Sequence, residues 1–177
     1  TTLSGTISGD GGLTKSGDGT LVLSGSNSFT GATTVAAGTL TAGSTGALST
    51  STALTVASEA TFNLDAAQLI IGSLAGGGTV TTGTNALVVG LDNTDTAFSG
   101  TITNTGTAYG GGSHGTFAKA GTGTLTLDGA TIAGGEAYVF GGTVAVTSGT
   151  ASVDYFSVGT STTSGTPNTG TLAISGG

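Results

Sequence analysis

The chain has 177 residues, of which 36 are glycine and only 6% are charged, and nine acids against two lysines give a net charge of −7. So few cations exclude the phosphate contacts of a nucleic-acid binder and attraction to an anionic membrane, and no apolar run approaches the ~20 residues of a membrane-spanning helix. Regular short apolar runs argue against disorder, and a single proline argues against collagen.

Short stretches in which an apolar residue alternates with a small polar one recur along the chain, and this is the period of a β-strand. Each stretch ends in glycine, serine, asparagine or aspartate, which mark turns. The predicted strands, in chain order, cover residues 20–25, 38–43, 53–58, 60–65, 78–83, 86–90, 100–106, 124–129, 142–149 and 170–176. The segment 65–76 comes nearest to a helix, but its short length and final glycines favour a strand. The chain is therefore predicted to be all-β.

One long stretch of the sequence is repeated. Residues 14–40 align without a gap on residues 118–144, at an offset of 104 residues, and 3–8 align on 98–103 at an offset of 95. The difference predicts a loop insertion near 106–115, within one domain over 1–177 made of modules at about 1–97 and 98–177. The repeated motif consists of Lys15, Gly17, Gly19, Thr20, Leu21 and Leu23, and then of Lys119, Gly121, Gly123, Thr124, Leu125 and Leu127.

A finer spacing is visible within the modules. Thr-apolar-Thr triplets begin at Thr39, Thr79, Thr101 and Thr124, with gaps of 40, 22 and 23 residues. The gaps indicate a coil of roughly 20–23 residues, with one triplet missing between the first two. Coils of this size predict a single-stranded right-handed parallel β-helix, a β-solenoid of about eight coils, with apolar residues inside and threonine outside.

The stretch "SGDGGLTKSGDGTLVLSGSNSFTGATTVAAGTL" at 8–40 resembles the autotransporter-associated β-strand repeat, also called the passenger-associated transport repeat. The matching residues are Leu13, Lys15, Gly17, Gly19, Thr20, Leu21, Leu23, Gly25, Asn27, Phe29, Thr30, Gly31, Thr34, Val35, Gly38, Thr39 and Leu40. The second copy departs from the pattern, with "ATIAGGEAYVF" in place of the asparagine-aromatic step. The resemblance implies a passenger of a bacterial type V secreted protein, at an extracellular or outer cell-surface location.

Few residues of the chain offer catalytic chemistry. His114 is the single histidine, and its neighbour in sequence, Ser113, is poorly placed for a proton relay. Two carboxylate pairs of the kind that glycosidases use can be drawn: Glu59 with Asp65, and Glu136 with Asp128. The two lysines that might assist them share one repeat position, which favours a structural role. We therefore expect no enzyme and no cofactor, and a polysaccharide-active enzyme is the least favoured alternative.

The stretch "LDNTDTAF" at 91–98 contains a weak candidate for a metal site. Asp92, Asn93 and Asp95 provide the hard oxygen ligands that Ca²⁺ prefers. No glutamate or further aspartate completes the set, and a turn rich in such residues accounts for them without a metal. No metal is expected, and calcium is kept as the alternative.

Both ends of the chain read as strands without a charged cap, and an unpaired strand edge favours association. A complete mature subunit is expected to stack head to tail into a homopolymer, whereas a segment of a longer passenger would continue into further coils of an adhesin stalk. The residues expected at the polymer interface are Thr2, Leu3, Thr6, Ile7, Thr171, Leu172 and Ile174.

The competing class is a binding module. A flat threonine face would suit ice, and an exposed aromatic cluster or the 106–115 loop would suit a glycan or another host contact. The candidate aromatics are Tyr109, Tyr138, Tyr155 and Phe156, for which stacking inside the lumen or at corners is the favoured interpretation.

Overall fold

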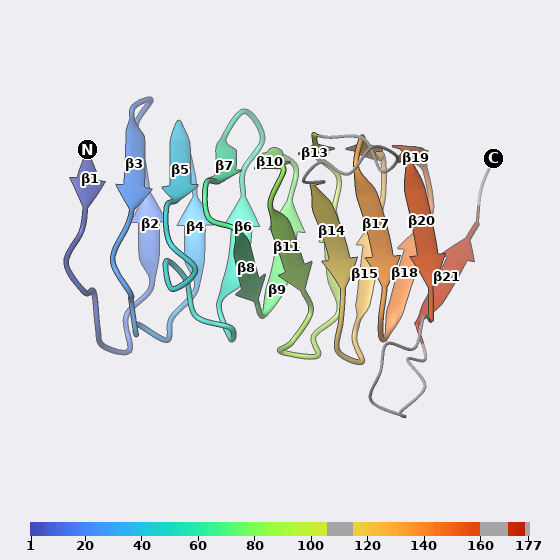
Figure 1. The fold of residues 1–177 in the computed structure, drawn as a ribbon, viewed down its shortest axis with the longest axis horizontal. Helices are drawn as coiled ribbons and strands as arrows, with labels where there is room; N and C mark the ends of the chain where they lie inside the picture. Colours follow the sequence, from blue (N-terminus) through green and yellow to red (C-terminus); the bar gives the residue numbers. More distant parts are fainter. Residues whose placement is uncertain (106–114, 160–169, 176–177) are drawn as a thin grey trace.

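The computed structural model describes residues 1–105, 115–159 and 170–175. These residues form three parallel β-sheets, and the chain coils round them from one end of the molecule to the other (Figure 1). Two sheets contain eight strands, so the chain makes about seven full turns between the first strand and the last of each sheet. The predicted β-solenoid is thereby confirmed, and the segment 65–76 contains two strands, at Gln68–Ile71 and Ser73–Gly76, and no helix.

The sheets are named here by their strands. Sheet A consists of β1 (Thr2–Leu3), β3 (Thr20–Leu23), β5 (Thr39–Ala42), β7 (Thr61–Leu64), β10 (Thr79–Gly83), β13 (Thr101–Asn104), β16 (Ala130–Ala133) and β19 (Gly149–Ser152). Sheet B consists of β2 (Leu13–Lys15), β4 (Thr33–Val35), β6 (Ala53–Val56), β9 (Ser73–Gly76), β12 (Thr96–Phe98), β15 (Thr124–Leu127), β18 (Thr143–Val146) and β21 (Thr171–Ile174). Sheet C consists of β8 (Gln68–Ile71), β11 (Ala86–Val89), β14 (Thr116–Lys119), β17 (Glu136–Val139) and β20 (Tyr155–Val158).

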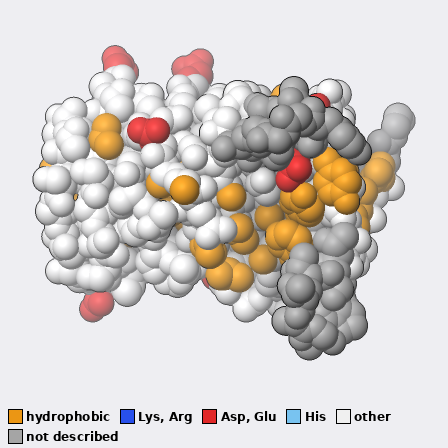
Figure 2. All heavy atoms as spheres, viewed as in Figure 1, with side chains coloured by type: hydrophobic (Ala, Val, Ile, Leu, Met, Phe, Trp, Pro, Cys, Tyr) orange, Lys and Arg blue, Asp and Glu red, His pale blue; other side chains and the backbone are white. Residues whose placement is uncertain are grey.

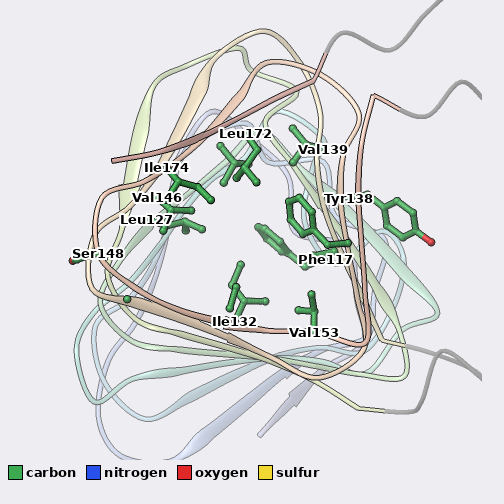
Figure 3. A pocket seen from close by; sticks show the side chains of 15 residues that line it. Phe117, Leu127, Ile132, Tyr138, Val139, Val146, Ser148, Val153, Leu172 and Ile174 are labelled. Atoms are coloured by element: carbon green, nitrogen blue, oxygen red, sulfur yellow. The ribbon is translucent and has the colours of Figure 1, made fainter. Parts of the chain in front are cut away.

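The core is the lumen of the coil. Side chains alternate across each strand, so in-register parallel stacking places the same inward position of every coil in one row. In sheet A the registered row consists of Leu21, Leu40, Phe62, Val80, Ile102 and Ile132. The end-on view in Figure 3 shows apolar side chains from three sides meeting inside this tube. Because each row places apolar side chains directly on apolar side chains of the next coil, small and apolar residues are enough to fill the lumen.

Sheet C begins only with β8, so the earliest coils close their third side differently. On that side Asn27 accepts a hydrogen bond from the Ile7 backbone N–H at 2.9 Å and donates to the Ala47 carbonyl at 2.8 Å. An amide side chain can do both at once. Asn27 thus links three successive coils where no strand ladder exists, and Phe29, two residues further along, is buried. These are the asparagine and the aromatic residue of the repeat motif.

The outer row of threonines differs from the row expected from the triplets. The missing coil is supplied by β7, whose Thr61 pairs with both Thr39 and Thr79. The triplet at Thr124 lies on β15 in sheet B, so its place in this row was predicted wrongly. The observed ladder on sheet A is longer than predicted and consists of Thr20, Thr39, Thr61, Thr79, Thr101, Thr131 and Thr150.

The two copies of the motif occupy different sides of the coil. The first copy runs through β2 in sheet B and β3 in sheet A, whereas the second runs through β14 in sheet C and β15 in sheet B. The offset of 104 residues is therefore not a whole number of turns, and the second copy is rotated by one side of the tube. Most of the predicted insertion, 106–114, lies outside the described residues. The division into two modules stays a prediction.

Candidate functional site

The first repeat lysine holds a corner of the coil. Lys15 occupies an inward position of β2 and is only 6% exposed. Its Nζ donates to the carbonyls of Ser16 at 3.2 Å, Gly17 at 2.6 Å and Ala37 at 3.0 Å. The third carbonyl belongs to the next coil. The ammonium group is thus satisfied by backbone oxygens at the turn between two strands, as a buried charge requires.

The second repeat lysine builds the same corner on another side. Lys119 is 1% exposed, and its Nζ donates to the Ala120 carbonyl. Its backbone oxygen accepts from the N–H groups of Phe140 and Gly141, just as the Lys15 oxygen accepts from two successive N–H groups of the following coil. Burial lowers the pKa of Lys119, and the carboxylates of Asp92 and Asp95 oppose that effect.

The burial of these lysines determines the charge of the surface. They are the two Lys or Arg residues of the whole sequence, and both lie inside. Neither contributes a cation to the outside of the coil, where the acidic side chains lie. An anionic ligand would therefore meet no lysine or arginine on this surface.

The candidate calcium residues connect two neighbouring coils. Asp92 Oδ1 accepts from the N–H and the hydroxyl of Thr94, at 3.0 Å and 2.8 Å. Hydrogen bonds from Ser73 and Thr94 outweigh the effect of burial and lower the pKa of Asp92. The amide oxygen of Asn93 accepts the backbone N–H of Thr122 in the turn before β15, and Asp95 Oδ1 accepts that of Thr124, the first residue of β15. Among the described residues no group of three or more acids, histidines or cysteines is arranged to hold a metal, and calcium stays the alternative to the expectation of no metal.

The carboxylate pairs proposed from sequence are not brought together. Glu59 and Asp65 flank opposite ends of β7, and a four-residue strand spans ~13 Å, more than the roughly 5–9.5 Å between glycosidase carboxylates. Asp128 Oδ1 accepts hydrogen bonds from the hydroxyls of Thr147 and Ser148. Glu136 lies on sheet C and is bonded to a tyrosine described below. His114, Ser113 and Tyr109 lie outside the described residues.

Both terminal coils expose residues that point into the lumen elsewhere. At the beginning Leu3 is 39% exposed, and at the end Ile174 is 71% exposed, with Phe156 and Val158 also exposed on β20. The last coils surround an apolar cavity of about 350 Å³, seen end-on in Figure 3. Its lining includes Phe117, Val139, Val146, Val153, Phe156 and Leu172. Of the predicted interface residues, Thr2 and Leu3 lie on β1, Thr6 and Ile7 follow it, and Thr171, Leu172 and Ile174 lie on β21.

An aromatic cluster lies on the outer side of sheet C. The rings of Tyr138 and Phe140 stack at a centroid distance of 5.2 Å, and those of Tyr138 and Tyr155 lie 5.7 Å apart. Tyr138 points away from the lumen in Figure 3, and its hydroxyl donates to Glu136 Oε2 at 2.8 Å. Stacking inside the lumen was therefore predicted wrongly for Tyr138 and Tyr155, whereas Phe156 does line the lumen. The sequence analysis did not single out Phe140. Its two-residue spacing from Tyr138 was the available signal, because side chains two residues apart on an extended chain point to the same face.

Figure 2 shows that apolar side chains gather over sheet C toward the C-terminal end, on a face that is otherwise mostly uncharged. On the same outer side of sheet C, the preceding strands carry apolar residues in register with Tyr138. This row consists of Ile70, Val88 and Ala118. In the described part of the chain, no helix is long and apolar enough to cross a membrane.

Comparison with known proteins gives this architecture a family. The passenger-associated-transport-repeat family model matches residues 13–42, the segment of Lys15, Asn27 and Phe29. The chain is 41% identical over 134 residues, or 72% of its length, to the adhesin BmaC autotransporter of Brucella suis biovar 1 (strain 1330). It spans 4% of that relative. No solved structure matches it. Residues 13–42 of the chain therefore carry the passenger-associated transport repeat of autotransporters, and the chain lies outside the cell or on its outer surface.

Proposed function

We propose that this chain is a rod segment of an adhesin-like passenger and that the rod lengthens by stacking coil on coil at its open ends. The observation that carries the proposal is the exposure of lumen residues at both terminal coils, with Leu3 at one end and Phe156, Val158 and Ile174 at the other. Exposed apolar surface beside unpaired strand edges favours association. The similarity to an autotransporter adhesin supports a structural rather than an enzymatic role.

The joint follows from the strand order. β1 and β2 begin sheets A and B, and β19 and β21 end them. A second copy placed end to end would pair its β1 with β19 and its β2 with β21, by the parallel ladder that already joins the coils. Leu3 and Leu13 of the second copy would cover the apolar cavity at the end of the first. Such a contact is heterologous and open, so it repeats into a fibre. In a longer passenger, the next coil would take the same place as a stalk.

The test is negative-stain electron microscopy of the chain over a dilution series. Filaments of uniform width that persist on dilution are expected for the unchanged chain. Leu172→Asp places a charge in the lumen at the joint and is expected to leave only short rods. Leu91→Asp alters an exposed leucine away from both ends and is expected to retain filaments. Short rods at every concentration of the unchanged chain would exclude the fibre and leave the stalk.

A second candidate function is favoured by the threonine ladder. Seven threonines lie in register on the outer side of sheet A, and they form a flat surface of hydroxyl and methyl groups at strand spacing. A regular surface of this kind suits an ordered lattice of water, so the alternative is ice binding. Thermal hysteresis that disappears in Thr79→Lys is expected for it, whereas an unchanged chain without hysteresis would exclude it.

A further inference from the structure

We propose that Tyr138, Phe140, Tyr155 and Glu136 form a binding site for a neutral oligosaccharide on the outer side of sheet C. This site supplies a ligand for the adhesin role, so the inference rests on the proposed function. It uses a different surface from the open ends, which lets the two proposals be tested separately.

The three rings lie against one another, with Tyr138 in contact with both of the others. Tyr138 and Phe140 are nearly parallel, with an interplanar angle of 19°, and Tyr155 is tilted by 50° against Tyr138. Tyr155 is 41% exposed. The registered pairing of Glu136 with Tyr155 places that carboxylate in the same outer row as the ring. Tyr138, Tyr155 and Glu136 are thus held on adjacent strands, and Phe140 directly follows β17, so binding would require little ordering.

The chemistry of this surface matches a sugar. The C–H faces of a pyranose are apolar and stack on aromatic rings, while its hydroxyl groups need hydrogen-bond acceptors and donors at the ring edges. Glu136 Oε2 already accepts from the Tyr138 hydroxyl at 2.8 Å. A carboxylate has further lone pairs, so Glu136 can accept sugar hydroxyls as well. The hydrogen bond to Tyr138 fixes the carboxylate at the edge of the rings.

Charge selects the class of sugar. The two lysines of the chain are buried at corners, and the net charge is −7. No lysine or arginine is therefore present to pair with a sialic acid or a sulfate, and Glu136 would repel either group. The carboxylate and the absence of surface lysine and arginine together favour an uncharged ligand that donates hydrogen bonds.

Size favours an oligosaccharide over a protein. Three aromatic side chains offer roughly 600 Å², part of which is already used where Tyr138 stacks on Phe140. A stable protein interface needs about 800 Å² on each partner. A chain of a few sugar rings fits within the smaller area.

The experiment is an array of immobilised oligosaccharides, probed with the full chain and followed by isothermal titration calorimetry. The neutral probes are hexamers of glucose, galactose and N-acetylglucosamine, and the anionic probes are sialyllactose and heparin oligosaccharides. We expect binding to a neutral probe and none to the anionic ones. Tyr155→Ala should lower the affinity by at least about tenfold. Tyr138→Phe and Glu136→Gln should each weaken binding while leaving the melting temperature close to that of the unchanged chain.

Leu91→Ala is the matched control, because it removes an exposed apolar side chain that follows β11, two strands of sheet C before β17, and it should bind like the unchanged chain. The proposal is overturned if the folded chain binds no neutral probe. It is also overturned if the Tyr155→Ala variant binds the neutral probe as tightly as the unchanged chain does. A third outcome also overturns the proposal: the unchanged chain binds an enzymatically deglycosylated matrix protein, and the Tyr155→Ala variant does not. The surface would then be assigned to a protein partner. Filament formation by the same samples reports on the end joints, so a failure of rod lengthening is recognised independently of sugar binding.

Discussion

At the scale of single residues, the chain uses its rare polar groups to replace missing backbone partners. Lys15 binds three corner carbonyls, and Asn27 bridges coils where sheet C is absent. Asn104 does similar work further along, since it accepts from Thr82 at 2.7 Å and donates to the Gly134 carbonyl at 3.2 Å. The charged and amide residues of the motif therefore stabilise the coil, and their presence in the sequence does not indicate catalysis.

Thr33 differs from these residues, because its hydroxyl is buried without a hydrogen-bond partner. It lies in an inward row between Leu13 and Leu54. Thr33→Val replaces that hydroxyl by a methyl group of similar shape, and we expect the free energy of unfolding to rise by about 1–2 kcal/mol. Urea denaturation measures the change, with the outward Thr79→Val as the control near zero. A fall in stability would mean that the Thr33 hydroxyl does have a partner in solution.

Tyr138 provides a pH-dependent property. Burial, together with the hydrogen bond and charge of Glu136, raises the pKa of Tyr138 to about 12. The folded state therefore favours the neutral phenol, and this contribution to stability is complete below the ordinary pKa of ~10 and is lost as the pH rises toward 12. Ultraviolet titration of tyrosinate, with Tyr138→Phe subtracted, measures the ionisation. Glu136→Gln should move the pKa of Tyr138 down, and ionisation of the unchanged chain near pH 10 would contradict the contact.

At the scale of strands and turns, the corners require glycine where the backbone is left-handed and coils approach closely. Gly38 has a φ of 65°, and a Cβ there would lie 2.4 Å from the Gly17 carbonyl oxygen of the preceding coil. We expect Gly38→Ala to lower the free energy of unfolding by at least ~2 kcal/mol, because strain and collision both act. Gly11 has no atom within 4 Å of its Cβ position, so Gly11→Ala should change stability by less than ~0.5 kcal/mol. Equal effects of the two substitutions in thermal melting would refute the corner argument.

The same scale explains why the repeat changes sides. A strand needs only alternation of apolar and small polar residues, and all three sheets present that pattern to the same lumen. The motif can therefore be moved from sheets B and A to sheets C and B without loss of its core contacts. Lys119 then forms a corner at the end of β14 much as Lys15 does at the end of β2.

At the scale of the whole molecule, stability comes from neighbour stacking and should therefore vary along the coil. β10 pairs with β7 on one side and β13 on the other, whereas β19 is exposed at all four residues and pairs only with β16. Hydrogen exchange should be slowest in β7, β10 and β13 and fastest in β19 and β20. Uniform protection in dilute monomer would contradict nearest-neighbour stability. Slower exchange in β19 at high concentration would accompany end-to-end stacking.

The sequence alone determined the strand period, the coil length, the apolar lumen and the repeat. Each of these features follows from the spacing of residues along the chain, because parallel strands stack in register. Three features needed the tertiary structure. The threonine ladder passes through Thr61, which no triplet marks, because register is set by all three sheets together. The two motif copies lie on different sides because the number of residues in each turn varies. Tyr138, Phe140 and Tyr155 meet outside the lumen because residues far apart in sequence become neighbours only when coils stack.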